Sequence, residues 1–149
     1  MKDIERIKAR GEIIEKFINL ETLINSIISQ HYFGKVRQDF FFDLLYNQSF
    51  NFGLRMQIIE KIIENPEKEK MEKLRELNAI RNYFAHCGPE VFPGHPPINP
   101  EEGRIPHPAN YNKTIDFDDL YNKFVSIEPE ISAYLGEIFT NLRGIMTKE

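Results

Sequence analysis

Apolar side chains recur every three or four residues along most of this chain, which is the spacing of helices that bury one face. Turn-forming residues separate these stretches from one another. The pattern predicts helices over about 3–32, 36–46, 52–65, 67–86 and 117–145. No segment alternates apolar and polar residues for long enough to indicate a sheet. We therefore expect an all-α fold, a bundle of four to five helices.

Residues that begin or end helices lie at the edges of these stretches. Gly34 is a stop signal after the first helix, and the segment NQSFNFG at 47–53 is typical of a turn. Pro66 marks the boundary between the third and fourth helices. Asp116 can cap the last helix, and Pro129 predicts a kink or a break within it.

A proline-rich connector precedes the last long helix. Residues 88–113 hold seven of the nine prolines in the chain, so we expect this segment to be irregular. A connector of this length is uncommon in a small domain and often has a function. We interpret 1–149 as a single domain with this one long connector.

Composition restricts the class of protein. A chain of 149 residues with 41% hydrophobic and 28% charged side chains can bury a core of its own. The single cysteine, Cys87, excludes an internal disulfide and fits a reducing compartment. The sequence has no apolar run of about 20 residues and no signal-peptide core. We expect a cytoplasmic protein without a membrane partner.

The charge is spread unevenly along the chain. The formal net charge is −4, with a net of +1 over residues 1–87 and −5 over residues 88–149. Tight binding of duplex nucleic acid without regard to sequence needs a concentrated basic face, and the sequence shows none. A small phosphate site built from a few residues remains compatible with this charge.

The stretch LNAIRNYFAHC, residues 77–87, places polar side chains in an otherwise apolar helix. At about 100° per residue, Arg81 falls inside the apolar arc of the fourth helix. Asn82 and His86 are four residues apart and share an adjacent face. A core-facing arginine must either be paired or open onto a site, because burial of an isolated charge is costly.

Two interpretations of this stretch follow from the residue types. In the first, Arg81 is paired with a carboxylate for structure, and His86 interacts favourably with the end of its helix. In the second, Arg81 binds a phosphodiester through its planar fork of donors and His86 transfers a proton. The two side chains lie about 140° apart around a straight helix, so one copy cannot easily bring both to the same phosphate. Two copies related by a two-fold axis could line one cleft with both residues, and a catalytic site therefore favours a dimer.

The same residues resemble a known motif. RNYFAH, residues 81–86, is similar to the Arg-x4-6-His motif of the HEPN superfamily (higher eukaryotes and prokaryotes nucleotide-binding domains), including the polar Asn82 after the arginine. The motif ends a late helix of a predicted bundle, as in that superfamily. FGLRMQIIEKII, residues 52–63, is similar to the helix that precedes the motif helix in many of its members.

The resemblance implies a metal-independent endoribonuclease that acts as a homodimer on tRNA or mRNA and leaves 2′,3′-cyclic phosphate ends. Arg81 would hold and neutralise the scissile phosphate, His86 would act as general base or acid, and Asn82 would orient His86 or bind the phosphate. Many relatives are toxins paired with antitoxins, or act against phage. Some carry a modified tyrosine two residues after the histidine, where this chain has Gly88.

A second resemblance points to a different class of function. The predicted framework is also similar to the mannitol-repressor family, whose members are described as regulators without a catalytic role. Other HEPN relatives serve only as interaction or dimerisation modules. The alternative is therefore a non-catalytic transcriptional regulator or interaction module that binds a regulatory protein.

Three further residues are candidates for the same site. Glu21 lies among apolar residues of the first helix, and it either pairs with an arginine purely for structure or pairs with Arg81 or Arg55 to hold that guanidinium in the site. Arg55 is either a further phosphate ligand or a surface charge. Tyr83 could stack on an unpaired base or pack half-buried. The apolar stripe of the third helix, beside Arg55, is assigned to Leu54, Ile58, Ile59, Ile62 and Ile63.

Metal and cofactor chemistry find little support in the sequence. His95 and His107 lie in the connector with no cysteine beside them, and the chain has neither a His-x3-His nor a Cys-x2-Cys spacing. No Gly-rich phosphate loop is present. We expect no metal site and no cofactor.

Overall fold

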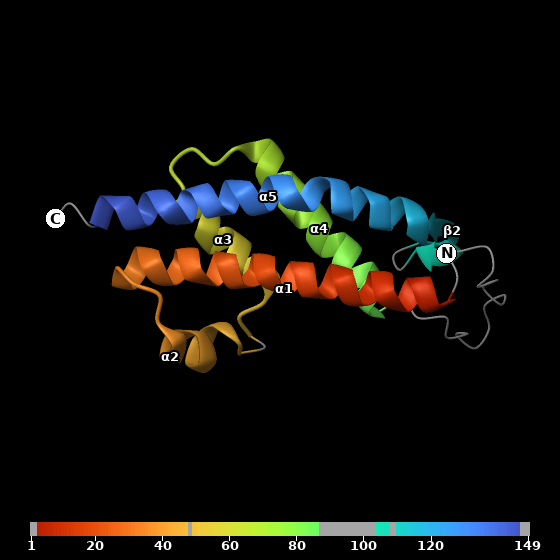
Figure 1. Ribbon diagram of the computed structural model, residues 1–149, viewed down its shortest axis with the longest axis horizontal. Coiled ribbons are helices and arrows are strands. Elements are labelled where there is room, and N and C mark those ends of the chain that lie inside the picture. The colour runs from red at the N-terminus through yellow and green to blue at the C-terminus, as the bar shows by residue number, and fades with distance from the viewer. Residues whose placement is uncertain (1–2, 48, 87–103, 108–109, 147–149) are drawn as a thin grey trace. The chain divides into compact units, whose positions relative to one another are not determined.

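Five α-helices dominate the computed structural model of the chain (Figure 1). The structure describes residues 3–47, 49–86, 104–107 and 110–146, and the side chains of 5–47, 49–85 and 116–144. The elements run in the order α1 (Asp3–Phe33), α2 (Gln38–Phe40), a π-helix η1 (Phe41–Leu45), α3 (Phe52–Ile62), α4 (Lys68–His86), β1 (Arg104–His107), β2 (Asn110–Asp116) and α5 (Phe117–Met146). The predicted all-α bundle is confirmed.

Helix boundaries follow the chemistry of a few residues. Gly34 adopts a left-handed φ of 67° and its amide donates to the Gln30 carbonyl at 2.9 Å, which ends α1. Asn51 caps α3 through the Leu54 amide, at 3.0 Å. Asp116 accepts from the Asp118 amide at 2.8 Å, so its predicted capping role is confirmed.

Three predicted elements differ from the structure. The third helix ends at Ile62 rather than at Asn65, because Ile63 already has an extended ψ of 118°, and Asn65 follows with a left-handed φ of 53°. The second is a three-residue α-turn that continues into the π-helix η1. Pro129 lies inside α5 without splitting it.

A short hairpin lies within and just beyond the connector that we expected to be irregular. β1 and β2 pair antiparallel, with Ile105 opposite Ile115 and an irregularity between Pro106 and His107. Residues 88–103 of the connector lie outside the described residues. The hairpin leads directly into α5, whose first turn Asp116 caps.

The contacts of the chain divide it into two compact units. Unit 1 comprises residues 1–17 and 75–128, and unit 2 comprises residues 18–74 and 129–149. α1, α4 and α5 each contribute one part to each unit. The largest fully buried side chains of unit 1 are Ile13, Phe17, Leu77, Phe84 and Phe124, and those of unit 2 are Leu20, Ile24, Ile27, Ile28, Leu45, Ile59 and Leu74.

The buried face of α3 agrees only in part with the stripe assigned from the sequence. Ile59 and Ile62 are buried as predicted and Ile58 and Ile63 are half-buried, whereas Leu54 is exposed. The structure also buries Phe52, Arg55 and Met56, so the buried set follows the i, i+3, i+4, i+7 spacing of one helix face. The assignment of Leu54 was wrong, and the assigned stripe left out the arginine that this face includes.

Candidate functional site

Arg81 occupies a fixed, half-buried position in unit 1. It lies on α4, five residues before the last residue of that helix. A terminal nitrogen donates to Oδ1 of Asn78 at 2.9 Å. The guanidinium carbon lies 4.7 Å from the centre of the ring of Phe17, a fully buried residue of α1. Arg81 therefore faces the core side of α4, as its place in the apolar arc predicted, with its planar group held against an aromatic ring.

Two arginines of α1 contact the aromatic pair Phe84 and Phe117. The Nε of Arg10 donates to the carbonyl of Phe84 at 2.5 Å. That carbonyl is among the last four of α4, which have no partner within the helix, so Arg10 caps the end that carries the motif. The Phe84 ring contacts the Phe117 ring at 5.0 Å, and Arg6 lies 6.0 Å from the centre of the Phe117 ring.

Sequence reasoning missed Arg6 and Arg10 as neighbours of the motif. A signal was present, since residues 6, 10, 13 and 17 fall on one face of a helix, and Ile13 and Phe17 are fully buried. The cationic side chains of Arg6, Arg10 and Arg81 thus all contact residues of the small aromatic core of unit 1. These arginines bring cationic groups to this aromatic core, while Asp118 and Asp119 follow Phe117 in the first turn of α5.

The remaining motif residues lie in the last two turns of α4. Asn82 and Tyr83 are half-buried. His86 is the last residue of the helix, and its side chain lies outside the described residues. The geometry between Arg81 and His86 therefore stays a prediction, as does stacking of a base on Tyr83.

Arg55 belongs to a buried polar cluster in unit 2. Only 7% of it is exposed, so the expected surface charge was wrong. Its Nε donates to Oδ1 of Asn25 at 2.9 Å, and a terminal nitrogen donates to the carbonyl of Leu45. Glu21 lies 3.6 Å from its other terminal nitrogen, which is one of the two pairings expected for Glu21. These contacts join α1, η1 and α3, and they direct the guanidinium away from solvent.

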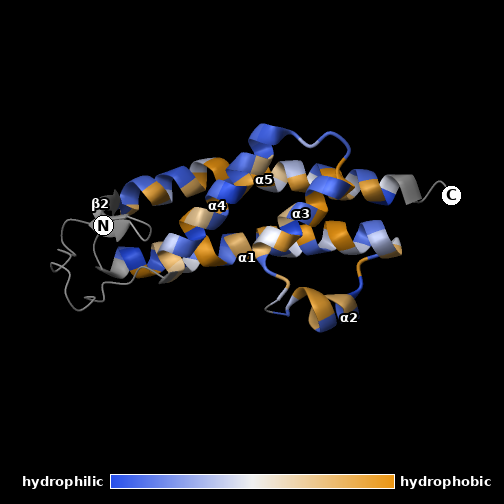
Figure 2. Cartoon of the chain, turned by 180° about the vertical axis from the view of Figure 1, so that it is seen from behind, coloured by the Kyte–Doolittle hydropathy of each residue, from blue (hydrophilic) through white to orange (hydrophobic). Residues whose placement is uncertain are grey.

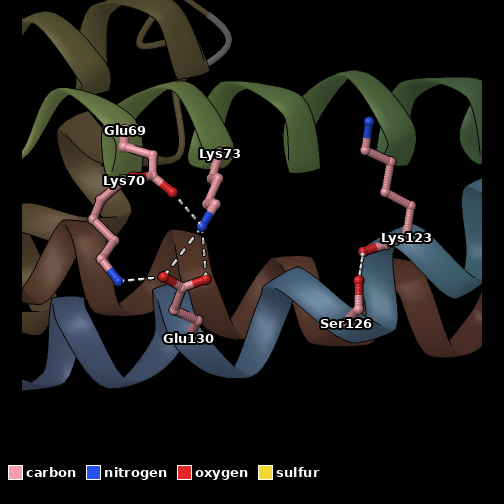
Figure 3. A network of polar contacts seen from close by, with 6 residues as sticks. All are labelled: Glu69, Lys70, Lys73, Lys123, Ser126 and Glu130. Carbon is pink, nitrogen blue, oxygen red and sulfur yellow. Dashed lines mark hydrogen bonds and ion pairs between the residues drawn. The ribbon is translucent and has the colours of Figure 1, made fainter.

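A second polar cluster, also in unit 2, joins α4 to α5 (Figure 3). Glu130 accepts from Lys70, and from Lys73 at 3.0 Å, while Lys73 also contacts Glu69 at 2.7 Å. Hydrogen bonds from Lys70 and Lys73 lower the pKa of the Glu130 carboxyl below its ordinary value of 4.5. Each charge has an opposite partner, so we interpret the cluster as structural.

The described residues offer no metal centre. No group of three or more His, Cys, Asp or Glu side chains within the described part of the chain could hold a metal ion. Cys87 and His95, and the side chain of His107, lie outside those residues.

Comparison with known proteins adds no relative. Searches against protein-family models, curated proteins and solved structures find no match to this chain. Among the residues that the structure describes, every helix is too short or too polar to span a bilayer. The functional argument therefore rests on the motif and its surroundings in unit 1.

Proposed function

We propose that this chain is a HEPN-type, metal-independent endoribonuclease that acts as a homodimer, in the manner of the toxin or anti-phage proteins that its motif resembles. The observation that carries the proposal is the position of Arg81. Its guanidinium is half-buried and stacked on Phe17, in a helix that ends at His86 five residues later. A fixed arginine near a helix end that also carries a histidine suits phosphodiester chemistry.

In the proposed reaction the ribose 2′-hydroxyl attacks the adjacent phosphorus, and the bond from phosphorus to the 5′-oxygen breaks. His86 takes the proton of the attacking hydroxyl or gives one to the leaving oxygen. Arg81 neutralises the charge that builds up on the phosphoryl oxygens. The products are a 2′,3′-cyclic phosphate and a 5′-hydroxyl, and the RNA supplies its own nucleophile.

The neighbours of Arg81 support such a role. Asn78 and Phe17 fix the orientation of the fork, which reduces the entropy lost when a phosphate binds. Arg10 caps the last turn of α4 through the Phe84 carbonyl and thereby restrains the backbone that leads to His86. Arg10 brings its charge to this helix end, and Arg6 lies beside the Phe117 ring that contacts Phe84.

The same contacts also support a competing proposal, a non-catalytic regulator or interaction module. An arginine that stacks on a buried ring and binds the side chain of a residue three positions earlier on its own helix can be wholly structural. In that case a protein partner, such as an antitoxin or a regulatory protein, would replace RNA as the ligand. An activity measurement separates the two proposals.

The test is cleavage of total tRNA and of a labelled single-stranded RNA in the presence of EDTA. The wild-type chain is compared with His86→Ala and Arg81→Lys, and the matched controls are His31→Ala, at an exposed histidine of α1, and Arg75→Ala, at an exposed arginine of α4. We expect both motif variants to lose at least about 100-fold in rate, the usual contribution of a general acid or base for His86 and of a positioned transition-state charge partner for Arg81. Both controls should cleave normally.

The chemistry of the new ends completes the test. Cyclic-phosphate and 5′-hydroxyl ends, formed without metal and lost in the motif variants, would support the nuclease. A folded wild-type chain that cuts neither RNA, or His86→Ala with unchanged cleavage, would contradict it and favour the regulator.

A further inference from the structure

Exposed aromatic side chains gather in one short segment of unit 2. The chain has 12 phenylalanines and six tyrosines, and eight of these aromatic residues lie between residues 32 and 52. Figure 2 shows the α2 and η1 ribbons largely in the hydrophobic colour. We call residues 32–46 the aromatic segment, because four of the six large apolar side chains exposed there are aromatic. These four are Tyr32, Phe33, Phe42 and Tyr46, and the other two are Val36 and Leu44.

The backbone presents two of these rings side by side. In the π-helix η1, Phe41 and Leu45 are buried, whereas 72% of Phe42 is exposed to solvent. The centres of the Phe42 and Tyr46 rings lie 5.6 Å apart, and the planes are inclined at 51°. The two rings therefore do not stack face to face, and 55% of Tyr46 also stays exposed. π-helices are rare and occur often at functional sites.

Buried polar contacts anchor the segment at both ends. The Ser29 hydroxyl, which is fully buried, donates to the Lys35 carbonyl at 3.0 Å and accepts from the Arg37 amide at 2.9 Å. At the other end Arg55 donates to the Leu45 carbonyl. The exposed rings are therefore carried on a fixed backbone, which reduces the conformational entropy lost when a ligand binds them.

The charges of the segment are balanced. Lys35 and Arg37 are cationic, and Asp39 and Asp43 are anionic. Arg37 and Asp39 bind each other, with Nε 3.1 Å from Oδ1. An anionic membrane and the phosphates of a duplex both favour a concentration of basic residues, which this segment does not have. A ligand of this surface therefore binds through the exposed rings rather than through its charge.

Flat aromatic rings are suited to unpaired nucleobases. Every base has a π face that stacks on an aromatic side chain with little regard to sequence, whereas the bases of a duplex already cover one another. Stacking needs no excess of positive charge, so it remains effective in a chain whose net charge is −4. The guanidinium of Arg37, which lies 5.1 Å from the centre of the Phe33 ring, adds a second kind of planar surface that stacks on bases.

We propose that the aromatic segment binds unpaired bases of RNA by stacking, with Phe42 and Tyr46 as the main platform. The choice of RNA as the ligand rests on the proposed function, because tRNA and mRNA offer unpaired bases in loops and single strands. The segment lies in unit 2, whereas Arg81 and His86 lie in unit 1. Loss of the platform should therefore raise the KM of cleavage and leave kcat unchanged.

The experiment measures binding of a labelled single-stranded RNA to the full chain by fluorescence anisotropy. The strand carries 2′-O-methyl groups, which remove the attacking hydroxyl, so the wild-type chain is used whether or not it is a nuclease. A strand of equal length without bases and a duplex of the same sequence provide the comparison. We expect both to bind at least about 5-fold more weakly than the single strand.

Substitutions at the two rings separate stacking from general apolar contact. Phe42→Ala and Tyr46→Ala should each weaken binding at least about 5-fold. Phe42→Leu, which keeps an apolar side chain without a ring, should be as weak as Phe42→Ala, and Phe42→Tyr should restore binding. None of these changes alters the charge, so the salt dependence should stay the same. Ile7→Ala is the control, because 67% of Ile7 is exposed in unit 1, and it should bind normally.

Folding of each variant is checked by circular dichroism. A wild type that does not bind the strand overturns the inference, and pelleting with phosphatidylcholine vesicles that depends on Phe42 would then assign the segment to a membrane. Equal binding of the strand without bases, normal binding by Phe42→Leu, or normal binding by both alanine variants also overturns it. A chain that stacks bases but cuts no RNA contradicts the nuclease alone. A chain that cuts RNA with an unchanged KM in Phe42→Ala contradicts only this inference.

Discussion

Arg55 carries a full charge inside unit 2, and its partners explain why this is tolerated. Burial of an isolated cation is costly, but this guanidinium donates to the Asn25 side chain and to the Leu45 carbonyl and lies beside Glu21. The Phe50 ring lies 5.7 Å from its central carbon. The guanidinium spreads five N–H donors over three nitrogens in a fixed plane, so it reaches separated partners that the compact ammonium of lysine would not span.

Loss of this side chain should destabilise the fold. Arg55→Ala leaves the Asn25 oxygen and the Leu45 carbonyl buried without their donor and Glu21 without its cation. We expect the free energy of unfolding to fall by about 3 kcal/mol, measured by urea denaturation. Arg75→Ala, at an exposed arginine of α4, should change it by less than about 0.5 kcal/mol. Equal effects of the two changes would contradict a structural role for Arg55.

Sequence reasoning located Arg81 but not its neighbours. The helical projection of α4 placed Arg81 on the apolar side, and its contact with Phe17 agrees with that placement. The contact between Arg10 and the Phe84 carbonyl spans 74 positions, and no local pattern encodes a pairing of that range. Arg55 could have been recognised, because Phe52, Met56 and Ile59 define the same helix face.

At the scale of elements, α4 and α5 are joined in unit 2 through one carboxylate. Glu130 lies between Lys70 and Lys73, and Glu69 completes the cluster on the α4 side (Figure 3). Because the two lysines hold the pKa of Glu130 below 4.5, this carboxyl binds a proton less readily in the folded chain than in the unfolded chain. The ionised form therefore contributes to stability.

This contribution should disappear in acid. It is fully present above the unfolded pKa of about 4.5 and is lost as the pH falls through the lower folded value. We expect Glu130→Gln to have a lower melting temperature than wild type at neutral pH, with the difference closing once Glu130 is protonated. Thermal melts followed by circular dichroism across this range provide the measurement. Glu137→Gln, at an exposed glutamate of α5, is the control and should show no such convergence.

The helix boundaries that a single residue determines were predicted from the sequence. The hairpin and the π-helix were not. Gly34 and Asp116 end and begin helices through their own backbone preference or side chain, and both were read from the sequence. The hairpin pairs Arg104 with Asp116 in a proline-rich segment that has no regular alternation of apolar and polar residues. The Leu45 carbonyl, at the end of the π-helix, accepts from Arg55 ten positions later. Neither contact leaves a local pattern in the sequence.

At the scale of the whole molecule, the negative net charge restricts how the chain could engage RNA. A charge of −4 provides little general attraction, so under the proposed function affinity would depend on a few local contacts. Arg81 from each copy is the main phosphate contact in the proposed dimer. Binding should therefore depend weakly on salt.

That dependence can be measured with single-stranded RNA and the His86→Ala variant, which should bind without cutting. Each neutralised phosphate on a single strand contributes a slope of about −0.7 to log K against log salt, so two contacts give roughly −1.4. Fluorescence anisotropy over a series of salt concentrations provides the slope, and Arg81→Ala in the same background should reduce it towards zero. A slope several times steeper would indicate an extended basic surface instead.

Pro129 interrupts the backbone hydrogen bonds of α5, although the helix itself is continuous. Proline has no amide hydrogen, so the carbonyl of Val125, four residues earlier, lacks its donor within the helix. The division between units 1 and 2 falls at this same point of α5. Backbone opening that begins on one side meets a gap in the hydrogen-bond ladder and need not cross it. We therefore expect the amides of α5 before and after Pro129 to exchange with water at separate rates, although the helix is a single element.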